Sequence, residues 1–538
     1  MLPSRLLDVG TLEGRDSQTR LIRTEEHDPE NPNYLTLSHC WGQTQHTMAL
    51  SHENLDSMMT GVSNEKMPRT FRDAIMITRF VGLRYLWIDS MCIIQPTKED
   101  NSDWDKEGRK MGDIYRNSTC TIAASSARDN TEGCFQGKPG SQFDVFAYPL
   151  FGKAVHRDWD EYSKMMGRNS EWIPLIEPPT ASWLNHVQNS PLSSRAWVLQ
   201  ERMLSPRILH CTMQGFFWEC SERRASEYEP LECRVDSHFR DQGLLNINKL
   251  LKEPSEELLG WQWRQIIEKY TKLQLSVKSD LLPALSGLAS IVQRHTGDDY
   301  IAGHWKSSLI SSLLWFRLEQ DENDKNSSQP TIFSAPSWSW ASKLGVVKFT
   351  PMETKDFPGR DPKDIVLTAV LRSVSAEAIS NNTFSWLSAS HLKVRGRLLD
   401  GNKLEGLGEL RTEKLKSSGY WTGFRPLLAG KGSQHVIKIP RLDDDGSRED
   451  CVPIDSKALC IIYDVSPPKE IAKDGLYLLQ LLRAARNDLA AAEYRHEGLV
   501  LTRSRFSGCF ERIGYFRSRH WELFDGVDGV DEADVDLV

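Results

Sequence analysis

The stretch MPRTFRDAIMITRFVGLRYLWIDSMCII, residues 67–94, decides the fold of the N-terminal part of this chain. Thr70 is predicted to cap a helix, with Asp73 three residues further on, and apolar residues then recur on one helical face. Residues 84–88, RYLWI, form an almost continuous apolar run, which is typical of a strand covered on both faces. That strand delivers Asp89 to its carboxyl end.

Two more apolar runs predict strands on either side of this unit. They are YLTLS at 34–38 and TCTIAA at 119–124, and helical patterns separate the three strands. Alternating strands and helices at this spacing predict a doubly wound α/β sheet of parallel strands. Ligands bind such sheets beyond the carboxyl ends of the strands, so Ser38, Asp89 and the start of the following helix are expected to be neighbours.

The helix that follows Asp89 carries an acid on its apolar face. In NSDWDKEGRKMGDIY, residues 101–115, a capping-box-like start at Ser102 and Asp105 precedes an apolar stripe. Glu107 falls on that stripe, among Trp104, Met111, Ile114 and Tyr115. Burying a carboxylate costs several kcal/mol unless it is paired or faces a cleft. Two interpretations stay open: a functional carboxylate in a cleft, or a structural one. The structural one lies at the wet margin of the stripe or pairs with an arginine such as Arg72, Arg79 or Arg84.

The composition predicts a folded, soluble, intracellular protein and excludes several classes. A formal charge of −8 gives no basic footprint for nucleic acid. The N-terminus lacks a signal-peptide core and no run approaches a membrane span, so a cytoplasmic location without membrane contact is expected. The 10 Cys show no CxxC pair or zinc-like spacing, which predicts reduced thiols and no metal. No GxGxxG or P-loop phosphate-binding motif is present.

The chain length predicts two or three domains. Within the middle of the chain, 255–295 favours two helices and 300–317 a third, while 391–399 and 458–465 favour strands. The expected organisation is an N-terminal extension (1–33), the α/β domain (34–220) with a loop-rich insertion at about 135–190, a helical region (221–320), a linker (321–330), a β-containing region (331–524) and an acidic disordered tail (525–538).

Several blocks in a fixed order closely resemble the fungal heterokaryon-incompatibility (HET) domain family. The domain proper is covered by YLTLSHCWG, PRTFRDAI, RYLWIDSMCIIQ, DWDKEGRKMGDIY, TCTIAASSA and SSRAWVLQERMLSPRILH. Downstream, APSWSWAS, SDLLPALSGLA, DDYIAGHW and ERIGYF resemble the region common in stand-alone HET proteins. The resemblance implies a fungal protein of non-self recognition and programmed cell death, with self-association or an incompatibility partner protein.

The HET domain is also regarded as similar to the TIR domain, which is flavodoxin-like. Some TIR domains hydrolyse NAD with a glutamate on a helix that often carries a tryptophan a few residues earlier. Trp104 and Glu107 match that pattern. The resemblance therefore implies Glu107 as the catalytic residue and NAD as a substrate rather than a bound cofactor. Glycosidic cleavage passes through a cationic state, and a carboxylate near the ribose stabilises it.

Substrate contacts are expected from Ser38, Asp89 and Trp104, together with Trp41 and Gly42. Asp89 either orients a ribose hydroxyl or caps the turn that follows it. Ser38 and the backbone at Trp41 and Gly42 either contact a phosphate or ribose, or form a tight turn with a buried indole.

Two further groups of residues are interpreted as structural. His39 and Cys40 are adjacent on a strand, point to opposite faces and are unsuited to a base–nucleophile pair. In the block 195–202, Glu201 and Arg202 either complete the cleft or form a structural ion pair, and the ion pair is favoured.

Three function classes follow from these alternatives. An enzyme requires Glu107 in an open cleft with Asp89 or Ser38 within reach. A self-associating signalling module requires Glu107 buried in an ion pair. Other family members are encoded beside secondary-metabolite genes, so the third class is an accessory biosynthetic enzyme, which requires a larger apolar pocket for a lipophilic small molecule.

Overall fold

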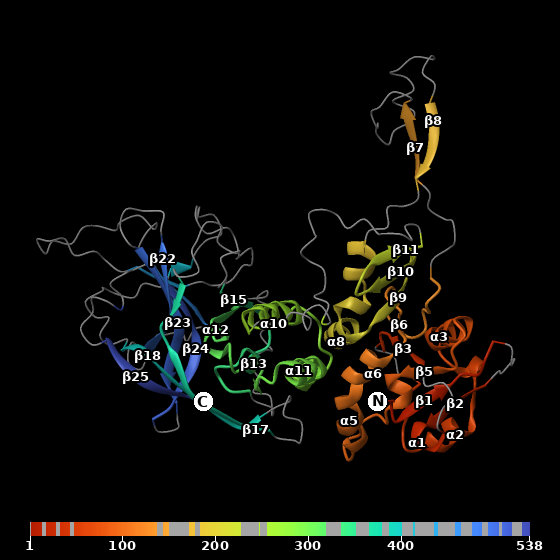
Figure 1. The fold of residues 1–538 in the computed structure, drawn as a ribbon, viewed down its shortest axis with the longest axis horizontal. Coiled ribbons are helices and arrows are strands. Elements are labelled where there is room, and N and C mark those ends of the chain that lie inside the picture. Colours follow the sequence, from red (N-terminus) through yellow and green to blue (C-terminus); the bar gives the residue numbers. More distant parts are fainter. Residues whose placement is uncertain are drawn as a thin grey trace, which may run out of the picture. The chain divides into compact units, whose positions relative to one another are not determined.

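The computed structural model divides the chain into two compact units, residues 1–249 and 250–538, which are described separately (Figure 1). Among the described residues, no helix is both long and apolar enough to cross a membrane. The structure describes residues 2–12, 18–27, 33–42, 48–136, 144–149, 172–177, 183–227, 247, 256–318, 335–350, 365–378, 387–400, 413–414, 435–438, 458–463, 476–486, 493–504, 508–518, 524 and 530–538.

The first unit is built on a nine-stranded mixed sheet, so a mixed α/β fold is confirmed. Its four central strands are parallel, with β3 (Tyr34–Ser38) between β5 (Tyr85–Ile88) and β6 (Cys120–Ala123), and β9 (Arg207–Thr212) beside β6. Both edges of the sheet are antiparallel. The prediction of a doubly wound parallel sheet is therefore correct for the centre only. The antiparallel strands are β1 (Arg5–Asp8), β2 (Gln18–Arg23), β4 (Val62–Ser63), β10 (Gly215–Cys220) and β11 (Arg224–Ser226).

The segment expected to be an N-terminal extension contributes to this sheet. β1 pairs with β5 through Leu7 opposite Leu86, and β2 pairs with β1. Leu6 and Leu7 are fully buried. Residues of the segment 1–33 are therefore part of the α/β core. The short helices α1 (Thr24–His27), α2 (Leu55–Thr60) and η1 (Asn64–Lys66) lie between these strands in the chain.

Helices lie on both sides of the sheet. Figure 1 shows α3 (Arg69–Phe80) on one side and α5 (Ser102–Glu107), α6 (Met111–Asn117) and α8 (Ala196–Leu204) on the other. α3 begins at Arg69 after Pro68, and Thr70 does not cap it. The Thr70 hydroxyl and the Asp73 carboxylate instead accept hydrogen bonds from Gly133 and Cys134 backbone N–H groups. The predicted N-cap was wrong because both polar side chains serve a loop distant in sequence.

The predicted helix around Glu107 forms, but in three pieces. They are α5 (Ser102–Glu107), a 3-10 turn η2 (Gly108–Lys110) and α6 (Met111–Asn117). The apolar stripe is confirmed in α6, where Ile114 and Tyr115 are buried. Between β5 and α5, the single turn α4 (Asp89–Cys92) follows the strand directly.

The rest of the first unit contains more regular structure than expected. A two-stranded hairpin of β7 (Asp144–Pro149) and β8 (Trp172–Glu177) lies in the stretch predicted as loops. A π-helical turn η3 (Leu184–Gln188), a 3-10 turn η4 (Leu192–Ser194) and α8 (Ala196–Leu204) then lead into β9.

The second unit begins with a helical region that packs around tryptophans. The indole N–H groups of Trp263 and Trp340 both donate to the Gly303 carbonyl oxygen, at 2.9 and 3.0 Å. The two predicted helices are present as α10 (Glu256–Tyr270) and α11 (Pro283–Thr296), with a 3-10 turn η6 (Lys278–Asp280). The third predicted helix was wrong. Its place is taken by β12 (Tyr300–Ile301), β13 (His304–Trp305), α12 (Leu309–Ser312) and β14 (Trp315–Leu318), and β14 pairs with β15 (Val346–Phe349) after the turn η7 (Trp340–Ser342).

The β-rich C-terminal region is a ten-stranded sheet in which five strands pair in a closed ring, in the order β22, β18, β25, β24, β23 and back to β22. The predicted strand at 391–399 lies within β18 (Leu387–Asp400), and of the strand predicted at 458–465 the described residues form β21 (Ala458–Tyr463). The strands are β16 (Ile365–Leu367), β17 (Val370–Ala378), β18 (Leu387–Asp400), β19 (Glu413–Lys414), β20 (His435–Lys438), β21 (Ala458–Tyr463), β22 (Leu476–Arg486), β23 (Glu493–Arg503), β24 (Phe510–Ser518) and β25 (Val530–Leu537). The predicted linker at 321–330 lies outside the described residues.

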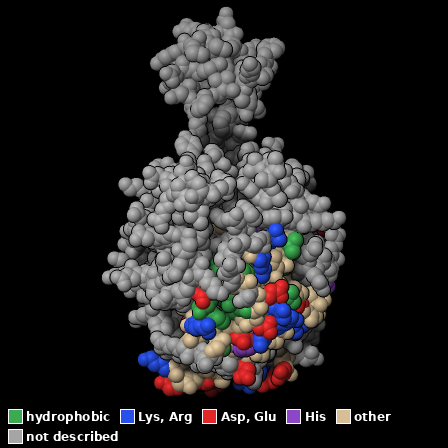
Figure 2. Space-filling view, turned by 90° about the vertical axis from the view of Figure 1, so that its left-hand side faces the viewer, with side chains coloured by type: hydrophobic (Ala, Val, Ile, Leu, Met, Phe, Trp, Pro, Cys, Tyr) green, Lys and Arg blue, Asp and Glu red, His purple; other side chains and the backbone are tan. Residues whose placement is uncertain are grey.

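The acidic C-terminal segment is not a disordered tail where the structure describes it, because residues 530–537 form strand β25. Val535 and Leu537 are fully buried. Glu532, Asp534 and Asp536 alternate with the apolar residues of this strand and pair with basic side chains of neighbouring strands, as in Arg395–Glu532 at 3.2 Å. Figure 2 shows acidic and basic side chains interspersed among the described residues on the face of the molecule that it draws.

Candidate functional site

The carboxyl ends of the two central strands bring together residues that the sequence singled out. Leu37 of β3 is in register with Ile88 of β5, so the next residues, Ser38 and Asp89, lie side by side at one edge of the sheet. The expected proximity of these two residues is therefore present. Ser38 is buried, whereas the Asp89 side chain retains 14% exposure.

A third residue, Glu201, completes this edge from α8. The Ser38 hydroxyl donates a short hydrogen bond to Glu201 Oε2. Burial raises the pKa of the Glu201 carboxyl to about 7; the Asp89 charge acts in the same direction, and Ser38 and Arg195 oppose it. A carboxyl group with this pKa is present in both protonation states near neutral pH. That property suits general acid–base chemistry.

Asp89 faces aromatic side chains from the turn after β3. The Trp41 indole N–H donates to Asp89 Oδ2 at 3.0 Å, and His39 Nδ1 lies 3.9 Å from Asp89 Oδ1. Burial lowers the pKa of His39 to about 4, so its imidazole is neutral at physiological pH. The Arg195 guanidinium donates to the His39 carbonyl oxygen, which fixes this turn to the start of α8.

The turn itself requires glycine. Gly42 has φ +79°, and a Cβ built there would lie 2.5 Å from Asp129 Cβ. Trp41 is half-buried and Gly42 exposed. The tight-turn interpretation of Gly42 is thus supported, while the Trp41 side chain keeps an exposed portion beside Asp89.

Glu107 lies at the same edge but has partners of its own. It is 3% exposed, and its Oε1 accepts hydrogen bonds from Ser4 Oγ and Lys110 Nζ, both at 2.9 Å. Ser4 immediately precedes β1, whose amino end lies at the carboxyl end of antiparallel β5. The ion-pair partner is a lysine three residues along the same helical segment rather than one of the predicted arginines. Arg79 donates to the Val9 carbonyl oxygen, and Arg84 pairs with Asp8.

Two indoles connect the acidic helices. Trp104 precedes Glu107 by three residues and Trp197 precedes Glu201 by four, and their rings meet edge to face with centroids 6.1 Å apart. Both are half-buried. The carboxyl edge therefore carries three carboxyl groups, of Asp89, Glu107 and Glu201, flanked by three half-exposed tryptophan side chains. In the part of the chain that the structure describes, no group of three or more His, Cys, Asp or Glu residues is arranged to hold a metal ion.

Residues 34–201 match the family model of the heterokaryon incompatibility protein (HET) domain. This segment is a HET domain. The match covers less than half of the chain. No curated protein and no solved structure matches it, so the similarity of its fold to TIR domains stays a prediction. The matched segment begins at the first residue of β3 and ends at Glu201, so the carboxyl groups of Asp89, Glu107 and Glu201 all belong to the HET domain.

At the end of the HET domain, the predicted ion pair of Glu201 with Arg202 was wrong. Arg202 makes a bidentate ion pair with Glu219 at 2.6 and 3.1 Å, whereas Glu201 turns to Ser38. Neighbouring helical residues point in directions about 100° apart, so one of the two faces the sheet and the other does not. Sequence reasoning also missed Tyr115 as a site neighbour. Burial raises the pKa of its hydroxyl well above the usual value, and the Glu201 and Asp89 charges add to this effect.

A second buried polar cluster lies between α8 and the hairpin that follows the HET domain. Ser125 Oγ is 3.1 Å from His210 Nδ1, and His210 Nε2 is 3.3 Å from Glu219 Oε2. This order resembles a nucleophile–base–acid relay. However, Ser125 is only 1% exposed, so a substrate does not reach its hydroxyl. The Glu219 carboxylate, moreover, forms ion pairs with both the Arg202 and the Arg224 guanidinium groups. Although burial alone would raise it, the Arg202 charge holds the pKa of Glu219 far below its usual range. The cluster is a structural ion-pair network.

Proposed function

We propose that this protein is a non-self-recognition and cell-death effector whose HET domain binds and hydrolyses NAD-like nucleotides at the carboxyl edge of its sheet. One observation carries the proposal: the Glu201 carboxyl, with a pKa of about 7, accepts a hydrogen bond from Ser38, and Ser38 lies beside the partly exposed Asp89 at the ends of adjacent parallel strands. Perturbed carboxyl groups at strand ends are typical of functional sites.

The chemistry needs one negative charge near the ribose and one group that takes a proton from water. In the proposed reaction the Asp89 carboxylate stabilises the cationic ribosyl group as nicotinamide leaves. Glu201, when ionised, accepts a proton from the attacking water. The indole of Trp41, whose N–H is held by Asp89, provides an aromatic surface against which a nicotinamide or adenine ring stacks.

Glu107 is the other carboxylate proposed for the reaction, on the family resemblance. Its Lys110 partner lies 2.9 Å away and neutralises the charge that the reaction needs. The Lys110 side chain is 28% exposed and the pair lies next to Ser4, so this ion pair opens before Glu107 acts on a ribose. Glu201 requires no such step, because Ser38 donates to it without adding charge.

The experiment is to incubate the purified protein with NAD and measure nicotinamide release. Glu201→Gln and Asp89→Asn are expected to lower the rate by at least about 100-fold, the range of a lost acid–base group. Glu107→Gln, measured alongside, decides between the two glutamates. Glu65→Gln, at an exposed position of η1, is the matched control and leaves the rate unchanged. Turnover that is equal in all four variants, or absent from the unsubstituted protein, overturns the hydrolase proposal.

A second candidate function is a non-enzymatic, self-associating signalling module, and the burial of Glu107 in an ion pair favours it. In that case fungal cells that express the protein die whether or not Glu201 is intact, whereas surface substitutions that keep the protein monomeric stop the response. Sedimentation velocity of the purified protein over a range of concentrations measures the association directly. A concentration-independent monomer excludes this candidate.

A further inference from the structure

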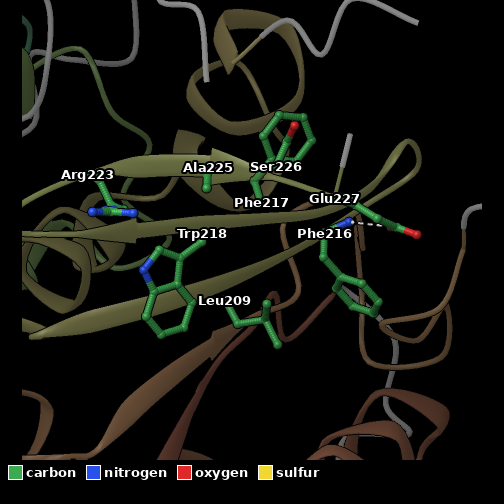
Figure 3. A pocket seen from close by; sticks show the side chains of 8 residues that line it. All are labelled: Leu209, Phe216, Phe217, Trp218, Arg223, Ala225, Ser226 and Glu227. Carbon is green, nitrogen blue, oxygen red and sulfur yellow. Dashed lines mark hydrogen bonds between the residues drawn. The ribbon is translucent and has the colours of Figure 1, made fainter. Parts of the chain in front are cut away.

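A hollow of about 370 Å³ lies on one face of the hairpin formed by β9, β10 and β11. Figure 3 shows Leu209, Phe216 and Trp218 pointing to the same side of these strands, and Phe217 pointing to the opposite side. The face is away from the Ser125–His210–Glu219 cluster, because Phe217 is in register with His210 and these two alternate with the hollow residues.

The floor of the hollow is an apolar cross-strand row. Leu209, Trp218 and Ala225 are directly opposite one another on the three strands, and Phe216, two residues before Trp218, lies on the same face of β10. The ring of Phe135 packs edge to face on the ring of Phe216, with the ring centroids 6.0 Å apart. Leu209, Phe216 and Trp218 stay half-exposed even though they adjoin each other. A flat aromatic ligand laid on Trp218 removes this apolar surface from water.

The two ends of the hollow differ in charge. At one end, Glu227 Oε2 accepts a hydrogen bond from the Phe216 N–H at 3.2 Å, and its own N–H donates to the Phe216 carbonyl oxygen. At the other end, Arg223 is exposed, and its guanidinium has no ion-pair partner among the residues that the structure describes. Figure 3 shows Arg223 beside Trp218, on the far side of the hollow from Glu227. The free positive charge thus lies at one end of an apolar floor.

We propose that this hollow is a binding site for a small aromatic anion, whose rings lie on Trp218 and Leu209 and whose carboxylate, sulfonate or phosphate group pairs with Arg223. The volume is within the lower range of small-molecule sites, roughly 300 to 1,000 Å³, and suits two fused or linked rings. Arginine pairs with such planar or tetrahedral anions through several N–H donors at once. The site is separate from the carboxyl edge and does not depend on the NAD reaction.

The test uses two probes that differ only in charge: 8-anilinonaphthalene-1-sulfonate, and N-phenyl-1-naphthylamine, which lacks the sulfonate. Titration by fluorescence is expected to show the anionic probe binding about tenfold more tightly than the neutral one, the effect of one charged hydrogen bond. Arg223→Gln abolishes that difference, and Trp218→Leu weakens both probes. Phe80→Ala removes the apolar residue with 78% exposure on α3 and, as a matched control, changes neither affinity.

A second readout keeps the proposal testable if Trp218→Leu disturbs folding. Cys220 is two residues from Trp218 on the same face, and it is half-exposed. Although its partial burial opposes the effect, hydrogen bonds from the Glu222 and Arg223 backbone and from Trp218 lower its pKa, which favours the thiolate form that attacks a maleimide. The bound anionic probe is expected to slow maleimide modification of Cys220 but not of Cys509 in the second unit. Equal affinities for the two probes in the unsubstituted protein, or equal protection of the two thiols, overturns the proposal.

Discussion

The hydroxyl of Ser38, the last residue of β3, donates a hydrogen bond to the buried carboxyl of Glu201 on α8, across 163 residues of sequence. This contact places a carboxyl group with a pKa of about 7 at the end of the central strand. Asp89 lies at the end of the neighbouring strand and Trp41 closes the turn above it. The candidate site of the HET domain is therefore centred on α8 and β3, with the helix of Glu107 at its margin.

The raised pKa of Glu201 makes stability depend on pH. Between pH 4.5 and about 7, Glu201 keeps its proton in the folded state but loses it in the unfolded state. The contribution of Glu201 to the free energy of unfolding therefore falls as pH rises. The loss is complete above the folded pKa and amounts to about 3 kcal/mol. His39, with a lowered pKa of about 4, acts in the opposite direction below pH 6.5. The free-energy difference between Glu201→Gln and the unsubstituted protein isolates the glutamate.

Urea unfolding from pH 4.5 to 8 measures this difference. The free energy of unfolding of Glu201→Gln, relative to that of the unsubstituted protein, is expected to increase steadily as pH rises to about 7. Above that pH the difference between the two proteins is expected to stay constant. A difference that does not vary with pH would show that Glu201 is not the buried titrating group.

Removal of the partner of Glu107 should destabilise the first unit. Lys110→Met leaves a carboxylate that is 3% exposed without its ion pair. We expect a loss of about 2 kcal/mol, below the value for a fully buried pair because Lys110 is 28% exposed. The double variant Lys110→Met, Glu107→Leu recovers most of this loss. Thermal unfolding of the unsubstituted protein and of the two variants checks the prediction, and a double variant no more stable than Lys110→Met contradicts it.

Substitution of Gly42 and of Gly82 by alanine distinguishes two costs of adding a side chain, backbone strain and close contact with a neighbouring residue. Gly42 and Gly82 both have φ +79°, but nothing lies within 4 Å of a Cβ at Gly82, whereas one at Gly42 meets Asp129 at 2.5 Å. Gly82→Ala is expected to cost about 1 kcal/mol, the left-handed penalty alone. Gly42→Ala costs about 2 to 4 kcal/mol, because overpacking adds to it. Equal losses in denaturant unfolding would mean that the turn moves away from Asp129 at little cost.

The Glu219 network should be structural rather than catalytic. Glu219→Gln leaves two largely buried guanidinium groups, of Arg202 and Arg224, without their counter-charge. The expected loss of unfolding free energy is about 3 kcal/mol. Glu222→Gln, an exposed neighbour, stays within about 0.5 kcal/mol. Ser125→Ala, in turn, should leave any nicotinamide release unchanged. A large loss of turnover in this variant would show that the Ser125, His210 and Glu219 cluster is catalytic rather than structural.

The sequence predicted the centre of the first sheet because β3 and β5 are buried on both faces and so read as unbroken apolar runs. It missed β25 because six acids in fourteen residues outweighed a regular alternation: Ala533, Val535 and Leu537 alternate with Glu532, Asp534 and Asp536. The acids are tolerated there because basic side chains of neighbouring strands lie opposite them.

The candidate site was only partly predictable for a different reason. Strand ends locate Ser38 and Asp89, because parallel strands share one carboxyl edge. The Lys110 partner of Glu107 was also visible, since residues three apart in a helix are neighbours. No local pattern, however, relates Glu201 to Ser38 or Tyr115. That contact depends on how α8 packs against the sheet, and packing between distant segments leaves no period in the sequence.

The most direct test of the central claim is the pH dependence of nicotinamide release from NAD by the purified protein. We expect the rate to rise with pH and to level off above about pH 7, as Glu201 ionises, and we expect Glu201→Gln to lose both the activity and this dependence. A Glu201→Gln protein that releases nicotinamide at the original rate, with the same pH profile, would contradict this expectation.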